Sequence, residues 1–229
     1  NADLNPEADA SHRYGAGADL RGNECGWEQD AEDARRVAEH LGIPFYVWDF
    51  EEEYKKRVVE YMVEGYRRGE TPNPDVMCNR EIKFGLFLER ALAAGADYIA
   101  TGHYVKREFR IQNLGFRVGK TKKSLDSKSC ILYSARDAQK DQSYFLWTLT
   151  QKQLQYCLFP IGDYLKSEVR EIARKAGLTT AEKKDSQGIC FLGQVRLGEF
   201  LKQYIPERTG VVMDTAGRAV AEHMGAAFV

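Results

Sequence analysis

The spacing of apolar residues predicts helices in the N-terminal half of the chain. Apolar side chains recur every three or four residues in three stretches, and a glycine follows each as a plausible stop. The stretches are 28–41, 54–66 and 79–94, and the glycines are Gly42, Gly69 and Gly95. Between the second and third stretches, Thr71-Pro-Asn-Pro74 predicts a break, because two closely spaced prolines cannot continue a helix.

Two short runs of aromatic and β-branched residues predict buried strands. They are Phe45-Tyr-Val-Trp-Asp-Phe50 and Asp97-Tyr-Ile-Ala-Thr101. Strands that alternate with helices are typical of an α/β domain with a parallel sheet, in which ligands bind beyond the carboxyl ends of the strands. We therefore expect Thr101, Gly102 and His103 at such an end.

The pattern changes near residue 140, where we predict a domain boundary. Helical spacing after it predicts one helix that ends at Gly177 and another that ends at Pro206, and 211–220 is typical of a β-hairpin. The expected organisation has four parts: a segment without clear pattern (1–24), an α/β domain of nucleotide-binding type (25–140), a smaller and mostly helical domain (141–208), and the start of a β domain (209–229).

Composition is that of an ordinary globular chain. Of 229 residues, 43% are hydrophobic and 29% are charged, and the formal net charge is −1. No apolar run is long enough to span a membrane, and no secretory signal is visible at the start. Five cysteines, an odd number without framework spacing, favour a reducing, cytoplasmic environment. Scattered histidines and the lack of a CxxC or HxxxH pair argue against a metal site.

Basic residues gather between Lys106 and Lys128. They are Lys106, Arg107, Arg110, Arg117, Lys120, Lys122, Lys123 and Lys128, opposed only by Glu108 and Asp126. One interpretation is a solvated, mobile loop. The other is a patch that contacts phosphates, whose binding would be sensitive to salt and blind to sequence.

Two cysteines lie in stretches that have the character of sites. Cys78 lies in Thr71-Pro-Asn-Pro-Asp-Val-Met-Cys-Asn-Arg-Glu-Ile-Lys-Phe84, and Cys190 in Lys184-Asp-Ser-Gln-Gly-Ile-Cys-Phe-Leu-Gly193. Each borders a loop marked by proline or glycine, where we expect a reachable thiol that can act as a nucleophile. Cys157 follows Leu154 at helical spacing and is expected in the core.

These two strings, with Ala100-Thr-Gly-His-Tyr104 and Lys140-Asp-Gln-Ser-Tyr-Phe145, resemble the tRNA-specific 2-thiouridylase family. The resemblance runs from about Cys25 to about Phe228. It implies an adenine-nucleotide alpha-hydrolase-like (PP-loop ATPase) domain with a parallel sheet. The family's Ser-Gly-Gly-Val-Asp-Ser loop, which grips the ATP phosphates, does not occur in the sequence, and the C-terminal β-barrel is not found. We therefore expect an incomplete domain, the central part of such an enzyme, which would not thiolate tRNA by itself.

The resemblance also implies a role for particular residues. Cys190 would carry a persulfide, and Cys78 would be the nucleophile that frees its sulfur, leaving a Cys78–Cys190 disulfide. Asn73, Pro74 and Asp75 would surround the target base, Gly102 would approach ATP, and the tRNA contacts would be His103, Lys140, Asp141 and Gln142. An alternative for Asp75 is to cap the helix that begins near Asn79.

The activity implied is ATP-dependent transfer of sulfur from a cysteine persulfide to C2 of the wobble uridine. The family uses ATP, with Mg²⁺ expected, and the partners would be tRNA and a protein that donates or relays sulfur. One alternative is a tRNA-binding remnant without catalysis. Another is a related adenylating enzyme that delivers ammonia, which is disfavoured because it has no use for two loop cysteines.

Overall fold

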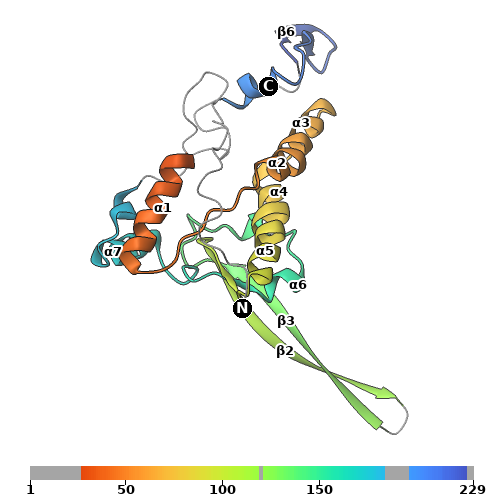
Figure 1. Cartoon of the computed structure of the whole chain (residues 1–229). Coiled ribbons are helices and arrows are strands. Elements are labelled where there is room, and N and C mark those ends of the chain that lie inside the picture. The colour runs from red at the N-terminus through yellow and green to blue at the C-terminus, as the bar shows by residue number, and fades with distance from the viewer. Residues whose placement is uncertain (1–26, 119–120, 184–195, 226–229) are drawn as a thin grey trace.

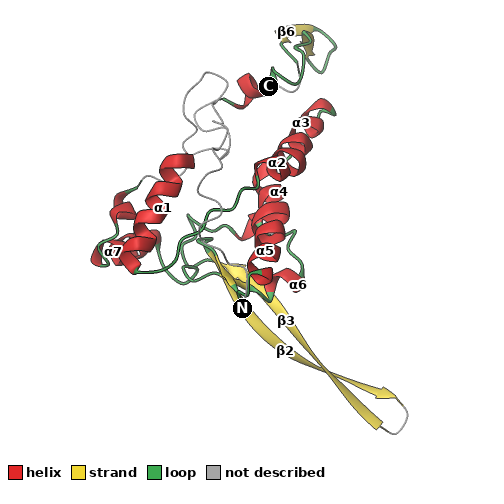
Figure 2. Cartoon of the chain, in the orientation of Figure 1, coloured by secondary structure: helices red, strands yellow, loops and turns green. Residues whose placement is uncertain are grey.

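The structure is a computed structural model that describes residues 27–118, 121–183 and 196–225. Two antiparallel helical rods pack side by side in a column, because Val58 of the first rod packs with Cys78 and Ile82 of the second. A long two-stranded arm projects from the lower end of that column (Figure 1). α1 and α7 lie side by side, away from the column, and the β5–β6 hairpin lies beyond its upper end (Figures 1 and 2).

The column consists of two continuous helices, 51–67 and 74–93, and each has a wide π-helical stretch inside it. The helices and helical turns are α1 (Trp27–Leu41), α2 (Glu51–Tyr54), η1 (Lys55–Val59), α3 (Glu60–Arg67), α4 (Pro74–Met77), η2 (Cys78–Leu86), α5 (Phe87–Ala93), η3 (Ser143–Phe145), α6 (Gln151–Leu154), α7 (Lys166–Lys175), η4 (Thr179–Glu182) and α8 (Leu197–Leu201). η1 and η2 are the π-helical stretches, whereas η3 and η4 are single 3₁₀ turns.

The helix ends predicted at four glycines are confirmed. Gly42, Gly69, Gly95 and Gly177 follow helices with φ angles of 67°, 77°, 94° and 73°. Side chains with a Cβ atom rarely adopt this left-handed conformation, so glycine ends each helix at low cost. α1 is anchored by Lys183, whose Nζ donates to Asp30 Oδ1 and Asp33 Oδ2 at 2.6 Å each.

In the part of the chain that the structure describes, six strands form three separate pairs. They are β1 (Ile99–Ala100), β2 (Val105–Val118), β3 (Thr121–Ser134), β4 (Cys157–Leu158), β5 (Gly210–Met213) and β6 (Ala219–His223). β1 pairs parallel with β4, whereas β2–β3 and β5–β6 are antiparallel hairpins. The β5–β6 hairpin confirms the prediction for 211–220. The parallel pair joins segments on both sides of residue 140, and the proposed division into domains stays a prediction.

The largest apolar cluster surrounds the parallel pair. It brings together buried side chains from the second rod, from β1 and β4, and from the start of the β2 strand: Phe84, Leu88, Ala91, Ile99, Val105, Leu146 and Cys157. Cys157 is fully buried, which confirms its predicted place in the core, although it lies on a strand and not on a helix. Gly162 lies so close to the Val105 carbonyl that a side chain there would collide with it.

The strand predicted over 45–50 is wrong. Within the described residues this segment pairs with no strand, and Tyr46 is 66% exposed. An aromatic and β-branched run fits a pleated, half-buried surface, but a strand forms only where a neighbouring strand takes its backbone hydrogen bonds. Trp48 instead packs beside Phe87, with ring centroids 5.3 Å apart, and under the Arg90 guanidinium.

The basic stretch between Lys106 and Lys128 is not the loop that was one interpretation of it, because most of it belongs to the β2–β3 hairpin. Two of its basic side chains bind the protein itself. Lys106 lies 3.9 Å from Asp163, and Arg107 stacks over the Phe109 ring and donates to the Leu154 carbonyl at 2.9 Å. The basic side chains at 110–128 lie outside the described part, so their contact with phosphates stays a prediction.

Candidate active site

The Asn73-Pro-Asp string forms the start of the second rod. The Asn73 side chain accepts hydrogen bonds from the backbone N–H groups of Asp75 and Val76 at 3.0 and 3.1 Å. Pro74 occupies the first helical position, where its missing N–H is no loss. The predicted helix therefore begins at Pro74 and not near Asn79, and its cap is Asn73 and not Asp75.

Cys78 lies inside this helix and is buried. Its relative exposure is 5%, and it packs in an apolar cluster with Val58 of η1 and Ile82 of η2. The expectation of a reachable thiol at a loop edge is therefore wrong for Cys78 in this conformation. Its partner in the implied disulfide, Cys190, lies outside the described residues, as does Cys25.

Asp75 is half-buried, and burial raises the pKa of its carboxyl, while the positive charge of Lys83 opposes that rise. A carboxyl in such surroundings can hold or release a proton closer to neutral pH than an exposed one. Asp75 therefore has the setting of a group that exchanges a proton with a neighbouring ligand.

Gly102 and His103 follow β1, as predicted for the carboxyl end of a strand in a parallel pair. His103 is 8% exposed, its Nδ1 lies 2.9 Å from Thr101 Oγ1, and its ring lies 5.5 Å from that of Phe84. Burial, helped by the charge of Lys83, lowers the pKa of His103 to about 4. The imidazole is therefore neutral at physiological pH and can both donate and accept a hydrogen bond.

The Lys140-Asp-Gln segment lies against this strand end. Gln142 Oε1 accepts from the Tyr104 N–H at 3.0 Å, and the Gln142 N–H donates to the Tyr104 carbonyl at 2.9 Å. Asp141 accepts from the Ala135 N–H and from the Ser143 hydroxyl, both at 2.7 Å. Asp141 and Gln142 thus hold the segment in place, while the side chain of Lys140 is exposed.

Asn79 connects the same segment to the helix of Cys78. It is 2% exposed, and its Nδ2 donates to the Phe145 carbonyl at 3.4 Å, while its buried Oδ1 has no hydrogen-bond partner among the described residues. Gln153 adds a second link, because its Nε2 donates to the Phe84 carbonyl at 2.8 Å. Residues far apart in sequence are thereby fixed around the second rod.

A cavity of about 930 Å³ opens beside Gly102. Its lining includes Gly102, Tyr104, Lys140, Gln142, Lys166 and Lys183, together with apolar residues of α1 and the segment after it. A side chain at Gly102 would meet nothing within 4 Å, so the space in front of this glycine is open. The size is typical of a small-molecule site. Asp30 and Asp33 also line the cavity and pair with Lys183, so the lining carries both signs of charge.

Comparison with known proteins assigns the chain to a family. Residues 13–194 match the family model described as "tRNA methyl transferase HUP domain". A relative from Akkermansia muciniphila is 49% identical over 203 residues, which are 88% of this chain and 52% of the relative. A relative from Flavobacterium johnsoniae is 52% identical over 192 residues, which are 83% of this chain and 45% of the relative. Both are named tRNA-specific 2-thiouridylase MnmA. The chain belongs to the MnmA family.

Membership confirms the resemblance seen in the sequence, and the HUP domain confirms an α/β fold of the adenine-nucleotide alpha-hydrolase type. The chain spans about half the length of the MnmA relatives that it matches, including one from Streptococcus pyogenes at 50%. In the part of the chain that the structure describes, no helix is long and apolar enough to cross a membrane.

The MnmA motif around Cys78 contains two site residues that sequence reasoning did not single out, Asn79 and Lys83. Neither residue type has a chemical signature by itself. The structure singles out Asn79 by its hydrogen bond to the Phe145 carbonyl, and Lys83 by the effect of its charge on the pKa of Asp75 and His103. No cluster of three or more possible metal ligands occurs among the described residues.

Proposed function

We propose that this chain is part of an enzyme that replaces the C2 oxygen of the wobble uridine in tRNA with sulfur. The observation that carries this proposal is the meeting of three motifs beside the first half of the second rod. The start of the helix at Asn73, the strand end at Gly102 and His103, and the segment 140–145 are joined there by the hydrogen bonds of Asn79 and Gln142.

In this proposal Asn73, Pro74 and Asp75 receive the target base. A base must leave its stack to reach such a place, at a cost of a few kcal/mol, and a preformed polar surface offsets that cost. The buried Pro74 and the capped helix start fix the backbone on which the exposed Asn73 and the half-buried Asp75 are presented. Asp75 would exchange a proton with the uracil, which its raised pKa supports.

His103 and Lys140 are the tRNA contacts that we propose from the strand end and the neighbouring segment. The neutral His103 would hydrogen-bond a base or ribose, and the exposed Lys140 would contact a phosphate oxygen. Asp141 and Gln142 would contribute to tRNA binding by holding Lys140 and Tyr104 in place, because their side-chain oxygens accept bonds from the protein.

We propose the cavity beside Gly102 as the place of ATP, because its volume suits a small molecule and Lys140 and Lys166 line it. When bound, ATP supplies the adenylyl group that turns the C2 oxygen of uracil into a leaving group. Mg²⁺ is usually held by one or two carboxylates together with substrate phosphates. We therefore expect any Mg²⁺ to be held largely by the phosphates of ATP.

Sulfur transfer would use both motif cysteines. Cys190 would carry the sulfur as a persulfide, loaded by a donor or relay protein. The Cys78 thiolate would attack the Cys190 sulfur, forming a Cys78–Cys190 disulfide and releasing the outer sulfur as hydrosulfide, which attacks C2 while AMP leaves. A thiol reductant would then return both cysteines to thiols. The two Cα atoms must come within about 7 Å for this step.

The sulfur step is tested by loading the chain with polysulfide and locating the added sulfur by peptide mass spectrometry. We expect it on Cys190 in the wild type, no loading at that peptide in Cys190→Ser, and loading without sulfide release in Cys78→Ser. Cys130→Ser is the matched control and should behave as the wild type. Sulfur found mainly on Cys130 or Cys157 would refute the assignment.

Binding and turnover are tested separately. Release of AMP in the presence of tRNA and ATP distinguishes an enzyme from a unit that binds tRNA without catalysis. The second possibility is favoured by the missing Ser-Gly-Gly-Val-Asp-Ser string, since phosphate binding in such sites relies on the backbone N–H groups of a glycine-rich turn.

A further inference from the structure

Lys83 lies on the helix of Cys78, one turn further along. The N–H of Phe87 bonds to the carbonyl of Ile82, five residues earlier, which is the π-helical pattern of η2. In such a widened turn, residues four and five apart come to lie one above the other, and π-helical turns are frequent at functional sites. Lys83 follows Asn79 by four residues and Cys78 by five, so the three share one side of the helix.

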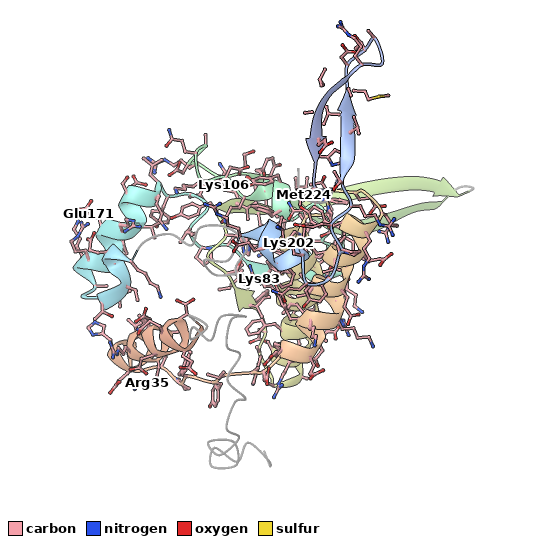
Figure 3. All side chains as sticks on the ribbon, turned by 90° about the horizontal axis from the view of Figure 1, so that it is seen from above. Arg35, Lys83, Lys106, Glu171, Lys202 and Met224 are labelled. Atoms are coloured by element: carbon pink, nitrogen blue, oxygen red, sulfur yellow. The ribbon has the colours of Figure 1, made fainter. Side chains whose placement is uncertain are left out.

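The ammonium group of Lys83 is exposed and makes no ion pair with any described residue, unlike the two arginines nearby on the column. Arg57 and Arg80 lie 3.5 and 3.1 Å from carboxylate oxygens of Glu81. Lys83 also lies on the inner side of the column, toward α1 and α7 (Figure 3). Its charge is therefore available to a ligand that enters from that side.

Lys83 lies near residues of the candidate site. The next residue, Phe84, packs its ring against His103, and the charge of Lys83 acts on the pKa of both His103 and Asp75. Of these two groups Asp75 is the acid, and its carboxyl is half-buried. An exposed positive charge therefore lies near the residues that we propose for the target base, and we call the position beside them the mouth of the site.

We propose that Lys83 binds a phosphate oxygen of the substrate at the mouth of this site. The inference rests on the proposed function. A base that is turned toward Asn73 and Asp75 leaves its own phosphates at the mouth, where the Asp75 carboxylate would repel them. A lysine is a compact charge that suits a phosphate oxygen, and here it would offset that repulsion. The phosphate belongs either to the RNA backbone or to ATP, and the experiment separates the two.

The test replaces Lys83 with Met, which keeps the length of the side chain and removes the charge, and with Arg, which keeps the charge. Lys56→Met is the matched control, because Lys56 is also an exposed lysine on a π-helical stretch of the column, η1. Affinity for a labelled anticodon stem-loop RNA is measured by fluorescence anisotropy between 50 and 200 mM KCl. Affinity for ATP is measured by calorimetry with Mg²⁺ present.

If the phosphate is that of RNA, Lys83→Met makes the slope of log affinity against log salt shallower by about 0.7, the value for one contact on a single strand. Stem-loops with uridine or cytidine at the target position should weaken by the same factor, because a phosphate contact is blind to sequence. Lys83→Arg and Lys56→Met should keep the wild-type slope. If the phosphate is that of ATP, Lys83→Met weakens ATP binding and leaves the RNA slope unchanged.

Unchanged affinity for both ligands in Lys83→Met overturns the inference and leaves the proposed function standing. An equal effect of Lys56→Met would also overturn it, because any exposed lysine would then do the same. A wild-type chain that binds neither RNA nor ATP refutes the proposed function, and the inference with it.

Discussion

Replacing Asn73 with Ala should destabilise the second rod of the column by removing its cap. None of the first four residues of this helix has a backbone N–H group without a partner. Pro74 has no N–H, the N–H groups of Asp75 and Val76 bond to the Asn73 side chain, and that of Met77 bonds to the Asn73 carbonyl at 3.4 Å. The alanine variant leaves two donors without a partner, and Val76 is only 7% exposed, so water cannot easily replace the lost bond.

The loss of such a cap costs about 1–2 kcal/mol, near the upper part of the measured range because two donors are affected. For a chain of 229 residues this corresponds to a fall in Tm of roughly 2–8 °C. Urea denaturation followed by circular dichroism measures the change. Asn73→Asp should keep the stability, because Asp is an equally good cap and its charge suits a helix N-terminus.

The aspartate variant also separates stability from function. It retains an acceptor for the helix but loses the amide donor, so a role of Asn73 in holding the target base would appear as weaker RNA binding in a fully stable protein. If Asn73→Ala unfolds at the same urea concentration as the wild type, or if Asn73→Asp is as unstable as Asn73→Ala, the cap does not stabilise the helix as described.

Two further outcomes follow from the site. The pKa of His103 is lowered from 6.5 to about 4. Between these pH values the folded state holds the imidazole neutral, while the unfolded state binds a proton. The contribution of His103 to stability is therefore complete above pH 6.5 and is lost as the pH falls toward 4. Urea midpoints of the wild type should therefore fall more steeply over this pH range than those of His103→Gln, and equal slopes would contradict the burial of the ring. Asp141→Asn should lower the free energy of unfolding by about 1.5–3 kcal/mol, because a charged acceptor of two short hydrogen bonds is replaced. Lys140→Ala, at an exposed position, should change that free energy by no more than about 0.5 kcal/mol. Equal stability of these two variants in urea would show that Asp141 does not hold the segment.

Local features of the chain were predictable from the sequence because their causes lie within a few residues. The helices end at Gly42, Gly69, Gly95 and Gly177 since only glycine adopts the required backbone conformation without strain. The start of the second rod was misplaced for an equally local reason: Thr71-Pro-Asn-Pro74 was interpreted as a break, although a proline is favoured at the first helical position when an Asn precedes it.

Strands and the site depend on contacts that the sequence does not display. The segment 45–50 has the composition of a strand but finds no neighbour among the described residues, whereas the polar stretch after Lys106 finds one in its own return strand. The motif strings identified the candidate residues, and the tertiary structure decided how each is used. It buries Cys78, binds Asp141 and Gln142 to the backbone, and leaves Lys83 without an ion pair in the described part, because burial and pairing are set by residues far away along the chain.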